Sequence, residues 1–233
     1  MDAMILVGGL GTRIKSVLGD IPKPLAPIAG RPFLHWQMQW LMTLGVTRFI
    51  LAAGYRSDVL VETMGYNFDG RPIEYSIESS PLGTGGAVIH ALNLVQNERV
   101  LILNGDSMAA VPMHGLWHSD ADVALVGVQV DDMGRYGALD FDRTSGRLLG
   151  FAEKGRQGPG CINAGVYAAR KSYLDSYHAL NTPCSLEQDI LTAGLKNFSM
   201  KVYPVEGFFI DVGIPEDYAR AQHLIPSFVL GLK

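Results

Sequence analysis

The chain has 233 residues, of which 48% are hydrophobic and 18% are charged, and its formal net charge at pH 7 is −4. This length can bury the core of one α/β domain, and no linker-like or repetitive segment divides the chain. We therefore expect a single domain over residues 1–226, followed by a short tail, 227–233. The acidic balance argues against an extended basic surface for nucleic acid, so any anion has to be bound by a few placed cations.

Cysteine usage and hydropathy bear on the compartment. Cys161 and Cys184 have neither a metal-ligand spacing nor the density of a disulfide framework, which is typical of a reduced, cytoplasmic protein. No basic N-terminal segment precedes a long apolar run, and no apolar run approaches the ~20 residues that cross a bilayer. We expect a cytoplasmic protein without a signal peptide and without a membrane partner.

The first predicted strand, residues 4–7, is followed by a glycine-rich segment that ends at Arg13. Glycines lack Cβ atoms, so their backbone N–H groups can approach a ligand closely. Arg13 and Lys23, which stands between two prolines, are the planar and the mobile kind of cation that phosphate oxygens accept. The segment therefore predicts a polyphosphate site, although it matches neither of the two common phosphate fingerprints.

Helices and strands alternate through the first half of the chain. We expect helices at residues 33–44, 57–64 and 87–95, and strands at residues 48–53, 73–77 and 99–103. This alternation predicts a mainly parallel sheet with helices on both faces, whose ligands gather at the carboxyl ends of the strands. Helix 33–44 is apolar on more than one side, which leaves two explanations open, burial in the core or a contact with a second copy in a dimer.

A second glycine-rich segment follows the predicted strand 73–77. It begins at Glu78 and places three glycines before or at the start of the next helix, which makes a close-approach surface for a base or its ribose. Glu78 itself can be a solvated loop acid, since acidic side chains are mostly exposed.

Two aspartates come directly after apolar strands. Asp106 follows strand 99–103, and Asp211 follows the apolar run 208–210. Acids at the carboxyl ends of buried strands face the ligand crevice, and their oxygens are the hard donors that magnesium prefers. For either aspartate alone a turn or cap role is the better explanation; together with the phosphate segment the two predict a magnesium site.

The stretch between the two aspartates has a more antiparallel pattern. We expect strands at residues 123–130, 137–141 and 148–152, and another that opens at Asn163. Ser185 begins a capping box, so we interpret Glu187 first as an acid that interacts favourably with the helix dipole, and second as a site residue. The pair His114 and His118 lacks an apparent third zinc ligand, and the acidic pair at 120 and 122 precedes a strand, so we discount both as sites.

The motifs ILVGGLGTR, IPKPLAPI, SPLGTGGA and FIDVGIPEDY resemble, in sequence and in order, the sugar-phosphate nucleotidyltransferase family. The resemblance extends over nearly the whole chain and is strongest to the D-glycero-α-D-manno-heptose 1-phosphate guanylyltransferase branch. It implies a Rossmann-like, GT-A-like α/β fold and the transfer of GMP from GTP to a sugar 1-phosphate, which releases pyrophosphate and supplies surface polysaccharide synthesis. Many family members carry a further C-terminal domain that this chain lacks, so we expect the transfer alone.

The resemblance also implies roles for individual residues. Arg13 and Lys23 would be catalytic, and Asp106 and Asp211 would bind Mg²⁺. The residues implied in nucleotide binding are Leu6, Gly8, Gly9, Gly11, Thr12, Glu78, Pro81, Gly83, Thr84 and Gly105. Glu78 takes the place of the family's base-reading side chain, and because a carboxylate only accepts hydrogen bonds, it suits the N–H and NH₂ groups of guanine together. Those implied in sugar-phosphate binding are Gly137, Glu153, Lys154 and Asn163.

Several alternatives to this assignment remain. Within the family, the chain could act on mannose 1-phosphate or use UTP or TTP instead of GTP. Outside it, a glycosyltransferase would need a nucleotide sugar and an acceptor, and a non-catalytic nucleotide-sugar sensor would have little reason to carry Arg13, Lys23 and both aspartates together.

Overall fold

The computed structural model describes residues 1–9, 14–152, 155–180 and 183–231. In chain order the elements are β1 (Asp2–Leu6), α1 (Lys15–Leu18), η2 (Lys23–Leu25), β2 (Pro27–Ile28), β3 (Arg31–Pro32), α2 (Phe33–Thr43), β4 (Arg48–Ala53), α3 (Ser57–Met64), β5 (Asn67–Phe68), β6 (Arg71–Ile77), α4 (Gly83–Ala91), η3 (Leu92–Leu94) and β7 (Arg99–Asn104). They continue with β8 (Ser107–Ala109), α5 (Met113–Trp117), β9 (Val123–Val130), β10 (Ala138–Phe141), β11 (Leu148–Ala152), β12 (Gly160–Arg170), α6 (Lys171–Asp175), η4 (Leu186–Leu191), α7 (Thr192–Gly194), β13 (Met200–Val205), β14 (Phe209–Asp211) and α8 (Pro215–Gly231).

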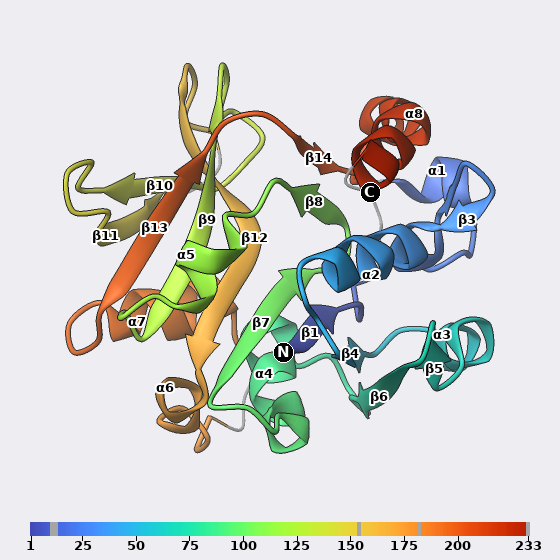
Figure 1. The fold of residues 1–233 in the computed structure, drawn as a ribbon, viewed down its shortest axis with the longest axis horizontal. Coiled ribbons are helices and arrows are strands. Elements are labelled where there is room, and N and C mark those ends of the chain that lie inside the picture. The colour runs from blue at the N-terminus through green and yellow to red at the C-terminus, as the bar shows by residue number, and fades with distance from the viewer. Residues whose placement is uncertain (10–13, 153–154, 181–182, 232–233) are drawn as a thin grey trace.

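The central sheet is mixed and mainly parallel in its N-terminal half (Figure 1). Strands β6, β4, β1 and β7 lie side by side and all run parallel. Beyond β7 the direction reverses, because β12 pairs antiparallel with β7, β9 and β10. Strand β13 then joins β9 in parallel, and β10 pairs antiparallel with β11. The predicted mixed α/β sheet is therefore confirmed, including the antiparallel stretch.

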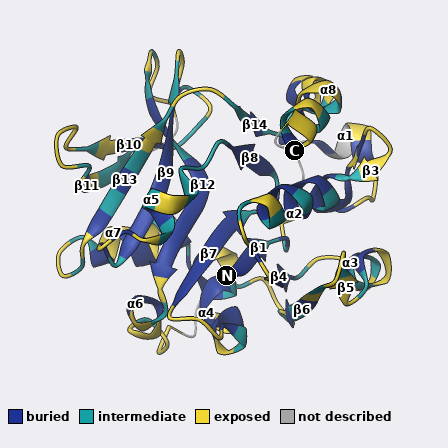
Figure 2. Cartoon of the chain, in the orientation of Figure 1, coloured by how far each residue is buried: buried dark blue, intermediate teal, exposed yellow. Residues whose placement is uncertain are grey.

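Helices cover both faces of the sheet because successive strand residues point to opposite sides. Ala3, Phe49 and Leu101 belong to one core cluster, which includes residues of α2, α3, α5 and α8. Their chain neighbours Met4 and Ile50 belong to a second cluster, with residues of α4, α6 and η4. Buried strands thus run between two partly exposed helical layers (Figure 2). Among the described helices, none is long and apolar enough to cross a membrane.

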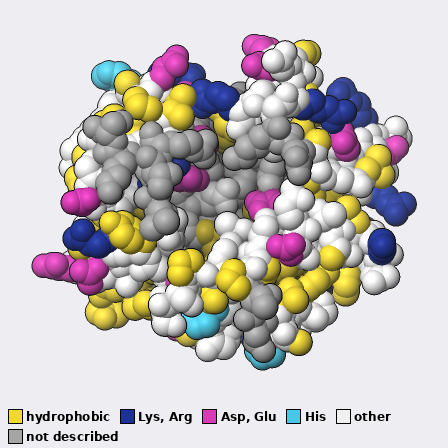
Figure 3. Space-filling model, turned by 180° about the vertical axis from the view of Figure 1, so that it is seen from behind, with side chains coloured by type: hydrophobic (Ala, Val, Ile, Leu, Met, Phe, Trp, Pro, Cys, Tyr) yellow, Lys and Arg dark blue, Asp and Glu magenta, His cyan; other side chains and the backbone are white. Residues whose placement is uncertain are grey.

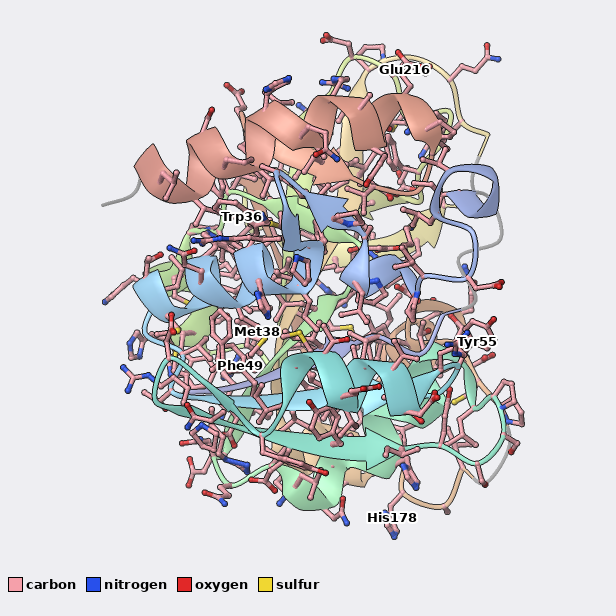
Figure 4. All side chains as sticks on the ribbon, turned by 90° about the vertical axis from the view of Figure 1, so that its right-hand side faces the viewer. Trp36, Met38, Phe49, Tyr55, His178 and Glu216 are labelled. Atoms are coloured by element: carbon pink, nitrogen blue, oxygen red, sulfur yellow. The ribbon has the colours of Figure 1, made fainter. Side chains whose placement is uncertain are left out.

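Helix α2 is buried on two sides within the chain itself. On one side, Met38 points toward the sheet, where Phe49 of β4 lies, whereas Trp36 points away from the sheet (Figure 4). On the other side, the Trp40 ring lies 6.2 Å from the ring of Phe228 in α8. The intrachain contact with α8 accounts for the second apolar side of α2, and the alternative of a dimer contact is not needed to explain it.

The structure describes part of the expected tail, 227–233, and this part docks on the body of the molecule. Residues 227–231 form the last turn and a half of α8. The segment is helical because Val229 is 1% exposed in the core and the Phe228 ring stacks on Phe208 at 3.8 Å. These partners are distant in sequence, so the short apolar run at the end of the chain gave no sign of them.

Helix α4 begins at Gly83, four residues before the predicted start at residue 87. Glycines are poor helix formers, and their low helix propensity led us to expect them in the loop before the helix. Here the backbone of Cys184 holds them: the N–H groups of Gly85 and Gly86 both donate to its carbonyl oxygen, at 2.8 and 3.4 Å. A tertiary contact therefore overrides the local preference.

Candidate active site

Two neighbouring cavities open at the carboxyl ends of the parallel strands. The first cavity has a volume of about 670 Å³ and lies between the ends of β1, β4, β6 and β7. The second cavity, of about 540 Å³, lies between β12, β14 and the connection from β9 to β10. Asn104, Asp106 and Glu187 line both cavities and so stand at their boundary. The face opposite to that of Figure 1 is hollowed near its centre, with acidic side chains at the hollow (Figure 3).

The structure brings most of the predicted site residues to these two cavities. Those lining the first cavity are Leu6, Gly8, Gly9, Lys23, Glu78, Pro81, Gly83, Thr84, Gly105 and Asp106. Those lining the second are Asp106, Gly137, Asn163 and Asp211. Gly11, Thr12, Arg13, Glu153 and Lys154 lie outside the described residues. Among the described residues, those expected to bind the nucleotide line the first cavity and those expected to bind the sugar phosphate line the second, while the roles themselves stay predictions.

Lys23 lies between the two predicted metal ligands. Its Nζ is 2.6 Å from Asp106 Oδ2 and 3.6 Å from Asp211 Oδ1, and its side chain is 11% exposed. The element η2 places it there: Leu25 N donates to the carbonyl oxygen of Pro22, and the proline, which has no N–H, starts this tight turn. A lysine from the N-terminal part of the chain thus forms ion pairs with two carboxylates from distant segments.

The two aspartates are held together by the small antiparallel sheet of β8 and β14. Asp211 pairs with Ser107 in this sheet, and Val212 N donates to the carbonyl oxygen of Asp106 at 2.9 Å. A Cβ added at Gly213 would lie 2.7 Å from Asp211 Oδ1 and 3.2 Å from Lys23 Nζ. The glycine that follows the aspartate in the motif is therefore required by the close approach of the carboxylate and the lysine.

A divalent cation fits this pair of carboxylates in chemistry. Among the described residues, no group of three or more His, Cys, Asp or Glu side chains could hold a metal ion by itself. Magnesium, however, is usually held by one or two carboxylates together with substrate phosphates and water. Two aspartates beside a cavity with glycine-rich walls match that pattern.

The turn that carries Asp106 is built by close backbone contacts. A Cβ at Gly105 would lie 2.6 Å from the carbonyl oxygen of Leu6, so only glycine lets this turn lie against the end of β1. From α2, Gln37 Nε2 donates to the carbonyl oxygens of Asn104 and Ser107, at 2.8 and 3.0 Å. The role of Gln37 was missed by sequence reasoning; its signal is a polar residue on the apolar side of a helix.

Glu78 is held in the wall of the first cavity. Its Oε2 accepts a hydrogen bond from Leu82 N at 3.0 Å. Its Oε1 lies so close to the loops after β1 and β4 that a Cβ would come within 3.0 Å of it at Gly8 and within 2.4 Å at Gly54. The carboxylate thus lies beside the first glycine segment instead of extending into solvent. Gly54 was missed because it lies in a loop without any other site signal.

Arg135 is a cation at the second cavity that sequence reasoning missed. It donates to the Asp217 carboxylate, which is itself 4% exposed and accepts a further bond from Arg220 at 3.0 Å. The Arg135 guanidinium also lies over the Tyr136 ring, 5.3 Å from its centroid. The hydrogen bond to Asp217 raises the pKa of Arg135, so the residue keeps its charge. Its position directly before Tyr136 and Gly137 was the available signal.

The signals that we discounted are also accounted for. The ring centroids of His114 and His118 lie 4.9 Å apart with the rings tilted at 49°, and no third ligand joins them among the described residues. The Asp122 carboxylate accepts from Ser199 at the amino end of β9, away from both cavities. Burial raises the pKa of the Cys161 thiol to about 11, as expected for a packing residue.

Comparison with known proteins decides the family. The family model described as nucleotidyl transferase matches residues 2–227. The chain belongs to the nucleotidyl transferase family. As a family member, it is 37% identical to D-glycero-α-D-manno-heptose 1-phosphate guanylyltransferase from Aneurinibacillus thermoaerophilus, with 98% of this chain and 100% of that protein covered. The enzyme of the same name from Campylobacter jejuni is 38% identical, with 94% and 97% covered.

A solved structure has the same fold as this nucleotidyl transferase over nearly the whole length of both chains. HddC from Yersinia pseudotuberculosis, crystallised in complex with GMP-PN, superimposes with a TM-score of 0.84 at 39% identity, covering 95% of this chain and 97% of that one. The predicted family resemblance, including its heptose branch, is thereby confirmed.

Proposed function

We propose that this nucleotidyl transferase transfers GMP from GTP to a sugar 1-phosphate, in the first place D-glycero-α-D-manno-heptose 1-phosphate, and releases pyrophosphate. The observation that carries the proposal is Lys23 with Asp106 and Asp211, gathered where the two cavities meet. The full-length similarity to two heptose 1-phosphate guanylyltransferases supports the choice of both substrates. A dimer, a cytoplasmic location and a role in surface polysaccharide synthesis stay predictions.

The reaction needs no general base. A phosphate oxygen of the sugar 1-phosphate attacks the α-phosphorus of GTP, and the bond from that phosphorus to the oxygen bridging to the β-phosphorus breaks. The attacking group is already largely ionised at pH 7, because the second pKa of a phosphomonoester is about 6. No histidine lines either cavity among the described residues.

The main obstacle is repulsion between the two anions. Two like charges about 4 Å apart repel each other by roughly 4 kcal/mol at an effective dielectric constant of about 20, and several such pairs meet here. We assign Lys23 to the phosphates at the reacting centre, because it lines the first cavity and its Nζ is 2.6 Å from Asp106, which lines both. We assign Arg13 to the pyrophosphate and Lys154 to the sugar phosphate. Arg135 adds a fixed positive charge at the second cavity.

Asp106 and Asp211 are the residues that would hold Mg²⁺. A bound magnesium ion neutralises phosphate charge and orients phosphate oxygens. The chain's own part is to keep the two carboxylates together through β8 and β14, and to keep Lys23 beside them. Glu78, Gly8 and Gly105 shape the wall for the nucleotide.

A panel of four nucleoside triphosphates against heptose, mannose and glucose 1-phosphates, followed by pyrophosphate release, tests the proposal. We expect the highest kcat/KM for GTP with the heptose substrate. Lys23→Ala should lower kcat by about 100-fold or more, as for other groups that stabilise developing charge. Lys201→Ala, whose lysine lies over the Tyr203 ring, is the matched control and should keep full activity. Absence of pyrophosphate release with every pair would refute the proposal.

A further inference from the structure

Glu187 stands between the two cavities and was not assigned to the site by its sequence pattern. Its side chain lines both the first and the second cavity. Sequence reasoning placed it in a capping box, but the return bond of that box comes from Asp189, whose Oδ2 accepts from Ser185 N at 2.7 Å. Ser185 Oγ in turn accepts from Gln188 N at 3.2 Å. The cap is therefore complete without the Glu187 carboxylate.

A buried chain of hydrogen bonds aims the Glu187 carboxylate. The hydroxyl of Tyr167, which is 1% exposed, donates to Glu187 Oε1 at 2.8 Å. Asn163 Nδ2 donates to the same hydroxyl at 2.6 Å, and Ser185 Oγ donates to Glu187 Oε2 at 3.2 Å. Burial raises the pKa of Tyr167 well above its ordinary value, so the phenol stays a neutral donor. Since a carboxylate has about four acceptor sites, these two bonds leave capacity for a ligand.

The segment that carries Glu187 is joined to the segment that lines the first cavity. Cys184 N donates to the carbonyl oxygen of Leu82 at 2.9 Å, and Leu186 N donates to Thr84 Oγ1 at 2.8 Å. A Cβ at Gly83 would lie 2.4 Å from the carbonyl oxygen of Cys184, so the two backbones are in direct contact. Residues 184–187 and 82–86 therefore hold each other in place, and with them Glu187.

The neighbours of Glu187 indicate which substrate it meets. Ser185, Gln188 and Asn163 line only the second cavity, so the polar surroundings of Glu187 open on the sugar side. A carboxylate repels phosphate and accepts only from donors, and hydroxyl groups are the donors that a sugar 1-phosphate offers.

We infer that Glu187 determines sugar specificity by accepting hydrogen bonds from hydroxyl groups of the sugar 1-phosphate, and that Tyr167 is the positioning residue that orients its carboxylate. This inference rests on the proposed function of the two cavities. It adds to the predicted sugar contacts a residue on a different element, η4, and gives Asn163 a second task as the donor to Tyr167.

The first test compares conservative variants in steady-state kinetics. Glu187→Gln should lower kcat/KM for the sugar 1-phosphate by about 10- to 100-fold, the range for a hydrogen bond to a charged group. The KM for GTP should change by less than about threefold. Tyr167→Phe should reduce kcat/KM for the sugar 1-phosphate by about 3- to 10-fold, because the carboxylate is kept but less well oriented. Asp189→Asn removes an acid from the same element and should leave kcat/KM for the sugar 1-phosphate unchanged.

The second test uses sugar 1-phosphates that each lack one hydroxyl group. In the unchanged enzyme, loss of the contacted hydroxyl lowers kcat/KM. In Glu187→Ala that additional penalty should disappear, whereas in Asp189→Asn it should remain. A structural role alone would leave the penalty intact in every variant, since it does not depend on any one hydroxyl.

Several results would overturn the inference. An equal loss toward GTP would place Glu187 on the ribose, and an unchanged kcat/KM for the sugar 1-phosphate in Glu187→Gln would remove it from recognition. A hydroxyl penalty that persists in Glu187→Ala would leave it a structural residue. Calorimetric titration of sugar 1-phosphates into the enzyme with a non-hydrolysable GTP analogue gives the same comparison without turnover. If the unchanged enzyme transferred no nucleotide, the proposed function would fail, while this titration would still decide on Glu187.

Discussion

At the scale of single residues, the site depends on carboxylates whose positions are set by glycines. Glu78 lies against Gly8 and Gly54, and Asp211 lies against Gly213. In each case a Cβ at the glycine would come within about 3 Å of the carboxylate oxygen, closer than ordinary van der Waals contact. The glycines therefore act through side chains that are remote in sequence, and not only through the flexibility of their own loops.

The position of Glu78 leads to a prediction about nucleotide choice. Replacing Glu78 by Gln keeps its size but exchanges one acceptor for a donor, which no longer matches the two donors of guanine. We expect the ratio of kcat/KM for GTP over UTP to fall by about 10-fold or more, as for the loss of a charged hydrogen bond. Pyrophosphate release with both nucleotides measures it.

Glu74→Gln is a suitable control for this ratio. Glu74 lies on the same strand, β6, but its carboxylate pairs with Arg48 at 2.8 Å, outside the residues that line the two cavities. Its variant should keep the ratio of the unchanged enzyme. If Glu78→Gln kept it too, Glu78 would not read the base, and the bond to Leu82 N would be its whole role.

At the scale of elements, packing between segments decides where helices begin and end. Helix α4 starts at Gly83 because the backbone of Cys184 holds its first turn, and α8 continues to Gly231 because aromatic rings hold its last turn. Neither partner is local. The termini of these two helices are therefore the places where local propensity gave the wrong boundary.

The end of α8 yields a prediction about stability. Phe228 stacks on Phe208 and contacts Trp40 but is only partly buried, so Phe228→Ala should cost about 2 kcal/mol, less than a fully buried phenylalanine. For a chain of this size that corresponds to a fall in Tm of about 4–8 °C. Thermal and urea unfolding measure it.

The neighbouring Leu230 provides the matched control for this packing. It is 47% exposed on the same helix, and Leu230→Ala should change stability by no more than about 0.5 kcal/mol. Equal effects of the two variants would mean that residues 227–231 do not pack on α2 in solution.

The sequence was informative where the signal is local and silent where it is not. Strand–helix alternation predicted the parallel half of the sheet. Aspartates after apolar strands predicted that Asp106 and Asp211 meet, but the small antiparallel sheet of β8 and β14 joins them, since β14 lies outside the central sheet. Gln37 and Arg135 were missed because their roles depend on segments far away in the chain, and Glu187 was interpreted as a site residue only in second place. Gln37, for example, contributes by holding the turn of Asp106, which no pattern within α2 can reveal.

At the scale of the whole molecule, the candidate metal site is assembled from both ends of the chain and its middle. Lys23 comes from η2, Asp106 from the turn between β7 and β8, and Asp211 from β14. Because folding is required to bring them together, a ligand bound at this point stabilises the folded state as a whole. Ligand binding at this site should therefore raise the unfolding temperature of the whole molecule.

We predict that Mg²⁺ and GTP together raise Tm by more than the sum of their separate effects. At ligand concentrations about 100-fold above Kd, binding contributes about 2.7 kcal/mol, or roughly 5–10 °C for a chain of this length. In Asp211→Asn the shift caused by GTP should no longer depend on Mg²⁺, because one of the two carboxylates that would hold the ion is lost. Glu216→Gln, an exposed acid on the outer side of α8 (Figure 4), should keep the full shift. Differential scanning calorimetry with EDTA, Mg²⁺, GTP and both ligands measures these shifts, and an unchanged metal-dependent shift in Asp211→Asn would exclude Asp211 as a metal ligand.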